Sequence, residues 1–114
     1  MNTTNSAPLC AVSDLAHGTI GSTLLPDGRR LALYHVDGNV YATDDHCTHG
    51  DASLSDEGSL EGCIVECGLH LGAFDVRTGK AVAAPCTKPI QTYPVEIRDG
   101  KVWLSEQVQL GALT

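Results

Sequence analysis

Two short pairs of cysteine and histidine constrain this chain more than any other feature of its sequence. Cys47 and His49 are separated by a spacer of seventeen residues from Cys67 and His70. Both pairs lie in or beside stretches rich in Gly, Asp and Ser, so two loops can bring two thiolates and two imidazoles to one point. Thiolates and imidazoles together suit iron–sulfur clusters, zinc or copper, and do not suit magnesium or calcium. The two pairs therefore predict a transition-metal site.

The spacing within each pair separates two kinds of metal site. Structural zinc also binds two Cys and two His, but zinc fingers usually place two or more residues between the members of a pair. Here one residue separates Cys47 from His49, and strands rather than a helix are expected to follow. In a Rieske [2Fe-2S] centre two Cys bind one iron and two His bind the other, so each loop gives one ligand to each iron. The spacing favours one Rieske cluster, with a zinc-stabilised interaction module as the alternative.

The other cysteines and histidines do not form pairs with this spacing. Five cysteines is an odd number, and in a reducing compartment they are more often metal ligands or small buried residues than disulfides. We interpret three cysteines as such buried residues and three histidines as structural or surface residues: Cys10, Cys63 and Cys86, and His17, His35 and His46.

Turn signals at short intervals predict an all-β chain. Asp-Gly or Thr-Gly pairs occur at 27–28, 37–38, 78–79 and 99–100, between stretches rich in Val, Leu, Ile, Tyr or Thr. We expect strands near 9–12, 20–25, 29–36, 40–43, 64–67, 73–76, 90–97 and 102–105, and no long helix. Pro94 predicts an edge or a bulge, with Tyr93, Val95 and Ile97 on a buried face. Trp103 is expected in the core.

Length and charge limit the classes of function. A chain of 114 residues forms one domain, and its net charge of -7 argues against nucleic acid and against an anionic membrane surface. No apolar run approaches the ~20 residues of a membrane span, and the first residues lack the pattern of a signal peptide. We therefore expect a cytoplasmic protein that binds neither nucleic acid nor membrane.

One stretch of the chain carries acidic residues and no Lys or Arg. It runs from 44 to 66 and contains Asp44, Asp45, Asp51, Asp56, Glu57, Glu61 and Glu66. Such a run is either a solvated face or a surface that attracts a basic protein partner.

The segment 44–89 resembles the Rieske ferredoxins that serve bacterial ring-hydroxylating dioxygenases. The resemblance includes Cys-Thr-His-Gly at 47–50, Leu-Ser at 54–55, Glu-Cys at 66–67, the stretch 74–81 and Pro85, with framing strands at 36–42 and 102–104. It implies a Rieske fold in which antiparallel sheets form a small barrel-like base with an inserted cluster-binding subdomain. The single domain 1–114 then divides into a subdomain at about 44–86, a base at about 8–43 and 87–105, and tails at 1–7 and 107–114.

The resemblance also implies a function. Such a ferredoxin holds its cluster through Cys47, His49, Cys67 and His70, is not catalytic alone, and carries one electron at a time. Its expected partners are an NAD(P)H-dependent, flavin-containing ferredoxin reductase and a terminal Rieske oxygenase, and we expect a monomer. A Rieske-like small subunit of an assimilatory nitrite reductase is the alternative within electron transfer. One departure from the family pattern is Gly68, where the family commonly has Pro; a Gly there loosens the loop and costs some stability.

Overall fold

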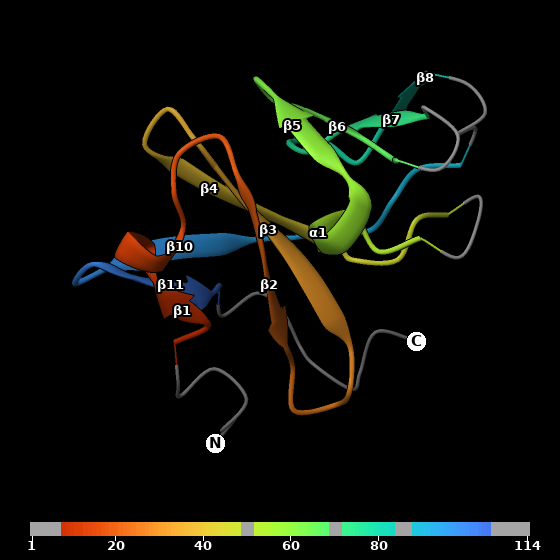
Figure 1. The fold of residues 1–114 in the computed structure, drawn as a ribbon. Helices are drawn as coiled ribbons and strands as arrows, with labels where there is room; N and C mark the ends of the chain where they lie inside the picture. Colours follow the sequence, from red (N-terminus) through yellow and green to blue (C-terminus); the bar gives the residue numbers. More distant parts are fainter. Residues whose placement is uncertain (1–7, 49–51, 69–71, 84–87, 106–114) are drawn as a thin grey trace.

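The computed structural model describes residues 8–48, 52–68, 72–83 and 88–105 of the chain. Within these ranges, most of the regular structure is β-strand, arranged in three antiparallel sheets (Figure 1). The expected all-β class is confirmed, and the described strands form open sheets rather than a closed barrel. The one α-helix of the described residues, α1 (Leu54–Glu57), has four residues, and no helix in these ranges is long and apolar enough to cross a membrane.

Two sheets, which we call the base sheets, come from both ends of the described chain. The central sheet has the strand order β2 (Ile20–Leu24), β3 (Arg30–Val36), β4 (Asn39–Asp44) and β9 (Thr92–Tyr93). The other contains β1 (Cys10–Ala11), β11 (Lys101–Leu104) and β10 (Val95–Arg98), with a short 3-10 turn (Val12–Asp14) after β1.

Tight turns connect the base hairpins as their sequences predict. Asp37 and Gly38 join β3 to β4 with φ of 52° and 83°, and Asp99 and Gly100 join β10 to β11 with φ of 53° and 72°. Positive φ at both turn positions matches the twist of antiparallel strands, and Gly and Asp adopt it at little cost.

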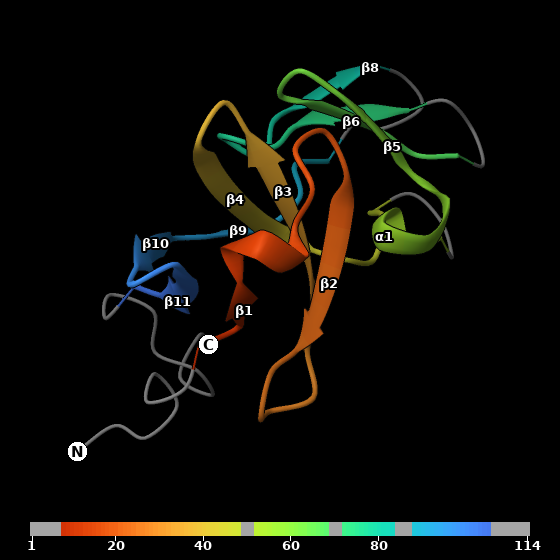
Figure 2. The same ribbon diagram turned by 60° about the vertical axis from the view of Figure 1, so that its left-hand side comes forward.

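The third sheet, which we call the outer sheet, is built from the middle of the chain. It has the order β5 (Ser59–Glu61), β6 (Ile64–Glu66), β7 (Ala73–Asp75) and β8 (Ala81–Ala83), and each strand has three residues. Figures 1 and 2 place the outer sheet and the β1-β11-β10 sheet on opposite sides of the central sheet. The helix α1 precedes β5 and packs against β2 and β3.

Strand β3 joins two hydrophobic cores because its side chains alternate between the faces of the central sheet. Leu31 and Leu33 face a core shared with β11, while Ala32, Tyr34 and Val36 face a core shared with the outer sheet. All four residues from Leu31 to Tyr34 are completely buried. A continuous apolar run in this position therefore indicates a strand covered on both faces.

The predicted strands agree with the structure to within a few residues, but two strands are missing from the prediction. These are β5 and β8, the edge strands of the outer sheet. Leu60 is the single apolar residue of β5, and β8 is Ala-Val-Ala, so neither has the β-branched and aromatic composition that favours strands. Their pairing with β6 and β7 outweighs their weak intrinsic preference.

Two burial predictions near the carboxyl end are wrong. Pro94 does separate two edge strands, β9 and β10, but these belong to different sheets, so the alternation that buries Tyr93 does not continue and Ile97 is 42% exposed. Trp103 lies outside both cores because its neighbours Val102 and Leu104 point inward. Its ring instead packs under the guanidinium group of Arg98, 4.6 Å from the ring centroid.

Candidate metal centre

Each predicted cysteine ligand lies where a strand has just ended and a loop begins. Cys47 follows β4 in the connection to α1, and Cys67 directly follows β6 in the connection to β7. The backbone N–H of Cys47 donates to the carbonyl of Ala52 at 3.0 Å, and that of Cys67 donates to the carbonyl of Gly72 at 2.7 Å. Each cysteine therefore starts a loop of the same length, 47–52 and 67–72, which we call the first and second ligand loops.

Both cysteines are buried in the same core. Cys47 is 0% exposed and Cys67 is 1% exposed, and both pack in the cluster that contains Phe74, Val65 and Leu54. A buried thiolate needs a nearby cation to offset its desolvation. Two buried cysteines at the start of two equal loops fit a soft metal centre, for which iron–sulfur clusters use thiolates.

The predicted histidine ligands follow their cysteines by two and three residues in the sequence. His49 and His70 lie at 49–51 and 69–71, outside the described residues. Within the described ranges no group of three or more Cys, His, Asp or Glu side chains forms a metal site. The structure thus places the two cysteines in one core, and all four ligands stay a prediction.

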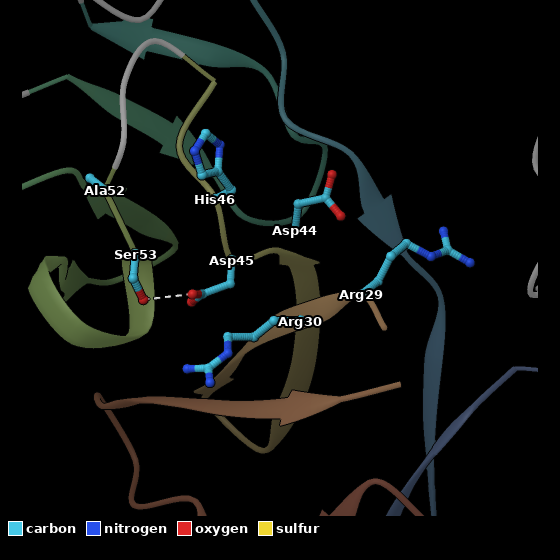
Figure 3. Close-up of a pocket in the computed structure, with 7 residues that line it drawn as sticks. All are labelled: Arg29, Arg30, Asp44, Asp45, His46, Ala52 and Ser53. Carbon is cyan, nitrogen blue, oxygen red and sulfur yellow. Dashed lines mark hydrogen bonds between the residues drawn. The ribbon is translucent and has the colours of Figure 1, made fainter. Parts of the chain in front are cut away.

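Asp45 forms hydrogen bonds that join the two ends of the segment containing the first ligand loop, and Figure 3 shows one of them. Its carboxylate accepts a hydrogen bond from the Ser53 hydroxyl at 2.6 Å and another from the Ser55 backbone N–H at 2.8 Å. The carbonyl of Asp45 also accepts from the N–H of Leu54 at 2.8 Å. Three bonds from one residue therefore close the segment that contains Cys47.

The second ligand loop is held by close backbone packing. A Cβ atom at Gly68 would collide with the backbone carbonyl oxygen of Glu57, the last residue of α1. Gly68 therefore allows α1 to lie directly against the loop that starts at Cys67. A larger residue here displaces either the loop or the helix, and the expectation that Gly68 also loosens the loop stays a prediction.

A charged turn closes the β7–β8 hairpin, at the end of β7 that is opposite the second ligand loop. Asp75 accepts hydrogen bonds from the backbone N–H of Arg77 at 2.9 Å and from the Arg77 guanidinium group at 2.9 Å. The Arg77 side chain holds the pKa of the Asp75 carboxyl below its usual value, mainly through these side-chain hydrogen bonds. Gly79 completes the turn with a φ of 82°. Asp75 thus caps the turn, as its position between Phe74 and the Thr-Gly pair suggests.

Tyr93 of β9 bonds to the last residue of the neighbouring base strand β4, three residues before Cys47. Its hydroxyl donates to the Asp44 carboxylate at 2.6 Å and accepts from the Arg29 guanidinium group at 3.2 Å. Burial, followed by the hydrogen bond to Asp44, raises the pKa of Tyr93 to about 12. Burial likewise raises the pKa of Tyr34, whose hydroxyl pairs with that of Thr43 at 2.8 Å.

A pocket of about 450 Å³ lies between the base and the first ligand loop (Figure 3). Arg29, Arg30 and Asp44 line it from the base, and the segments that flank the first ligand loop contribute Asp45, His46, Ala52 and Ser53. Arg29 is paired with Asp27 at 2.7 Å, and the two aspartates accept the hydrogen bonds described above. The pocket therefore lies where the base sheets meet the segment that contains Cys47.

The remaining cysteines and histidines agree with their structural interpretation where the structure describes them. Cys10 and Cys63 are half-buried and form no disulfide, and Cys86 lies outside the described residues. Burial raises the pKa of the Cys10 thiol. His35 bonds the Leu15 carbonyl through Nδ1 at 2.8 Å, while His17 accepts the N–H of Asp37 at 2.9 Å. His46 is exposed.

The acidic stretch is not one uniform solvated face. Asp45 is 4% exposed and bonds across the first ligand loop, while Asp44 is half-buried and accepts the Tyr93 hydroxyl. Four others are exposed, namely Asp56, Glu57, Glu61 and Glu66, while Asp51 lies outside the described residues. The expectation of a surface role is therefore wrong for Asp44 and Asp45.

Sequence reasoning missed the two residues that shape the loops, Asp45 and Glu57. One signal was available, because Ser53 and Asp56 form a Ser-x-x-Asp helix start. The Ser53 hydroxyl does accept the N–H of Asp56 at 3.2 Å. The presence of α1 could thus have been predicted, whereas its contacts with Asp45 and Gly68 depend on the tertiary fold.

Comparison with known proteins adds a family and named relatives. The family described as Rieske [2Fe-2S] domain matches residues 5–94. The ferredoxin component of the p-cumate 2,3-dioxygenase system of Pseudomonas putida is 48% identical, over 89% of this chain and 86% of that protein. The ferredoxin component of a naphthalene 1,2-dioxygenase system of Pseudomonas putida is 53% identical, over 82% of this chain and 88% of that protein.

A solved structure shows the same fold. It contains the complex of reduced oxygenase and oxidized ferredoxin in carbazole 1,9a-dioxygenase, and the matching chain is 44% identical with a TM-score of 0.80. The match covers 87% of this chain and 91% of that one.

Proposed function

Because this chain belongs to the Rieske [2Fe-2S] domain family, we propose that its two ligand loops hold one [2Fe-2S] cluster through Cys47, His49, Cys67 and His70. The two cysteines bind one iron and the two histidines bind the other. The burial of both cysteines in one core and the matching hydrogen bonds that close the two loops support this ligand set. When bound, the cluster supplies one-electron oxidation and reduction.

The chain is an electron carrier and not the oxygenase itself. The observation that carries this conclusion is its similarity to ferredoxin components of dioxygenase systems, at 48–53% identity over 86–88% of their length. The carrier takes electrons from an NAD(P)H-dependent, flavin-containing reductase and delivers them to the terminal oxygenase of an aromatic ring-hydroxylating system. The similar ferredoxin in complex with an oxygenase supports the second partner.

The residues of this chain contribute in two ways. The apolar side chains around Cys47 and Cys67, such as Phe74 and Val65, exclude water from the sulfur side of the centre. If the two histidine ligands lie at the surface, their rings are suited to electron exchange with a partner.

The domain organisation and compartment are part of the same proposal. We assign one Rieske domain, with a cluster-binding subdomain at about 44–86 and a base at about 8–43 and 87–105. The strands of the base sheets come before and after those of the outer sheet in the sequence, which supports this division. The nicotinamide-dependent reductase makes the cytoplasm the expected compartment, and the carrier acts as a monomer.

Two alternatives have less support. The Rieske family match and the ferredoxin relatives favour an iron–sulfur cluster over a zinc-stabilised module, and they favour a dioxygenase carrier over a nitrite reductase subunit. Metal analysis separates the first pair, because a Rieske protein contains about two iron and two acid-labile sulfide per chain and no stoichiometric zinc.

A coupled assay tests the carrier function. The purified protein is mixed anaerobically with NADH and the flavin reductase of a related dioxygenase system, and its visible absorbance is followed. We expect reduction only when the reductase is present, and reoxidation when the partner oxygenase with substrate and oxygen is added. Cys67→Ser serves as the control that cannot hold the cluster. The proposal is wrong if the protein is not reduced, or if it oxidises the aromatic substrate without the oxygenase.

A further inference from the structure

Asp45 is the one charged side chain that is buried among the described residues. A buried carboxylate is costly unless hydrogen bonds compensate for its lost water. Asp45 meets this requirement with every polar atom it has, because its backbone N–H also donates to the Arg30 carbonyl at 3.0 Å. A fully bonded buried charge two residues before a predicted ligand therefore needs an explanation.

Three of the four hydrogen bonds of Asp45 cross the first ligand loop, and the fourth joins its N–H to Arg30 in the base. Its carbonyl and both carboxylate oxygens reach the far end of the loop, at Leu54, Ser55 and Ser53. Figure 3 shows the Asp45 carboxylate directed at Ser53, across the space that separates the two ends. The segment so closed, 45–55, contains both Cys47 and His49.

The carboxylate also fixes the start of α1. Ser53 is the residue that caps this helix, and Ser55 lies in its first turn, where backbone N–H groups have no partner within the helix. Hydrogen bonds from N–H or hydroxyl donors to a carboxylate are stronger than those between neutral groups. Asp45 therefore couples the position of the first loop to that of α1.

Among its described residues, the second ligand loop has no carboxylate that plays the part of Asp45. Between described residues, its closure consists of the backbone bond from Cys67 to Gly72, and its packing against α1 occurs at Gly68. Because α1 contacts this loop through the Glu57 carbonyl, the helix that Asp45 holds at one end touches the second loop at the other. Asp45 is thus connected to both loops.

We propose that Asp45 is a positioning residue for the metal centre, which keeps the first ligand loop in the shape that presents Cys47 and His49. This inference rests on the cluster assignment made under Proposed function. Residues that orient ligands determine metal affinity and reduction potential without touching the metal. Asp45 acts in this way on the thiolate and imidazole of the first loop.

Two substitutions separate the shape of the side chain from its charge. In Asp45→Asn the amide oxygen can still accept from the Ser55 N–H, and the amide N–H2 can donate to the Ser53 hydroxyl. In Asp45→Ala both donors lose their acceptor. Asp75→Ala is the matched control, because Asp75 also accepts a backbone N–H and a side-chain donor, on a turn outside both ligand loops.

The readouts are the electron paramagnetic resonance line shape of the reduced protein, the midpoint potential, and the half-time of cluster loss to an iron chelator. For Asp45→Ala we expect broadened lines and cluster loss about tenfold faster, as the loss of the acceptor for two hydrogen bonds across the loop would produce. Asp45→Asn should keep the line shape and the half-time of the wild type, with a raised midpoint potential because one negative charge is removed. Asp75→Ala should match the wild type in line shape and half-time.

The outcomes are distinct. If folded Asp45→Ala keeps the line shape and half-time of the wild type, Asp45 has only a structural role and the proposal is overturned. If Asp45→Ala does not fold, Ser53→Ala decides, since it removes one donor and should shorten the half-time several-fold; an unchanged half-time overturns the proposal. If the wild type itself shows no Rieske spectrum, the cluster assignment fails instead.

Discussion

The base sheets contain strands of up to seven residues that bury aliphatic side chains on both faces, whereas every strand of the outer sheet has three residues. Leu31 and Leu33 on one face of β3 and Tyr34 on the other are completely buried. The ligand region, by which we mean both ligand loops, α1 and the outer sheet, has a core of its own around Phe74 and Val65, but two cysteines lie within that core. Small regions with short elements commonly need a metal to fold stably.

This difference indicates that the base and the ligand region are stabilised by different interactions. The base should fold through hydrophobic burial alone, while the ligand region should gain its order from the cluster together with Asp45 and Gly68. Binding of a metal centre contributes to folding free energy when the site is formed only in the folded state. Substitutions in the two regions should therefore differ in their effects on the cluster spectrum and on the free energy of unfolding.

Loss of a histidine ligand should have the largest effect. Replacing His49 or His70 with Ala should abolish the Rieske spectrum, because the iron loses a ligand that Thr48 or Gly50 cannot replace. Iron content and electron paramagnetic resonance of the purified variants provide the measurement. Cys10→Ser and Cys63→Ser are the controls and should keep the full spectrum. A native spectrum in either histidine variant would mean that the wrong ligands have been assigned.

A core substitution in the base should lower the free energy of unfolding and leave the cluster unchanged. Leu33→Ala should lower the free energy of unfolding by about 2–5 kcal/mol, because it opens a cavity in a fully buried position. The cluster spectrum of the folded variant should be unchanged. Leu24, which is 66% exposed, offers the control: Leu24→Ala should change stability by less than about 0.5 kcal/mol. Urea unfolding followed by circular dichroism measures the stability of both variants. Cluster loss in folded Leu33→Ala would contradict the view that the cluster depends on the ligand region and not on the base core.

A methyl group at Gly68 should affect both stability and the cluster. Gly68→Ala places a Cβ against the Glu57 carbonyl, and such overpacking costs about 1–3 kcal/mol. Because the clash lies beside Cys67, the spectrum should change as well. Gly100→Ala is a useful comparison, since its φ of 72° costs about 1–2 kcal/mol in the base without any neighbouring atom. An unchanged spectrum in Gly68→Ala would show that α1 does not press on the second loop.

Loss of the hydrogen bond between Tyr93 and Asp44 should have the smallest effect and a particular pH dependence. Tyr93→Phe removes the donor to Asp44, which should cost about 1–2 kcal/mol at neutral pH. In the folded protein the pKa of Tyr93 is raised to about 12, against about 10 in the unfolded chain. The raised pKa contributes stability that is fully present below pH 10 and is lost as the pH rises towards 12.

Urea unfolding at pH 7, 10 and 11 tests this dependence. The wild type should lose stability between pH 10 and 11 more steeply than Tyr93→Phe, so the difference between them should shrink. Parallel declines would contradict the assigned role of Tyr93.

The sequence predicted those parts of the molecule that depend on local chemistry. Asp37-Gly38 and Asp99-Gly100 predicted hairpins because positive φ is a local requirement, and the all-β class followed. The cysteines Cys47 and Cys67 were identified from spacing, and the structure places both in one core. The positions of His49 and His70 are predicted by the same spacing.

Features that depend on tertiary contacts could not be predicted in this way. Trp103 is large and apolar, but the inward direction of Val102 and Leu104 leaves it outside the core. Asp45 belongs to an acidic stretch and looks like a surface residue until α1 is known to bring Ser53 and Ser55 to it. The same is true of Gly68, whose role depends on a carbonyl eleven residues earlier.

The central claim is that one iron of the centre is bound by nitrogen, through His49 and His70, while Cys47 and Cys67 bind the other. The most direct test is the electron paramagnetic resonance spectrum of the dithionite-reduced protein, recorded beside a plant-type ferredoxin whose cluster has four cysteine ligands. Nitrogen ligation should lower the average g value below that of the all-cysteine cluster, and imidazole ¹⁴N couplings should be visible in pulsed spectra. An average g equal to that of the reference, with no nitrogen coupling, would contradict the assignment.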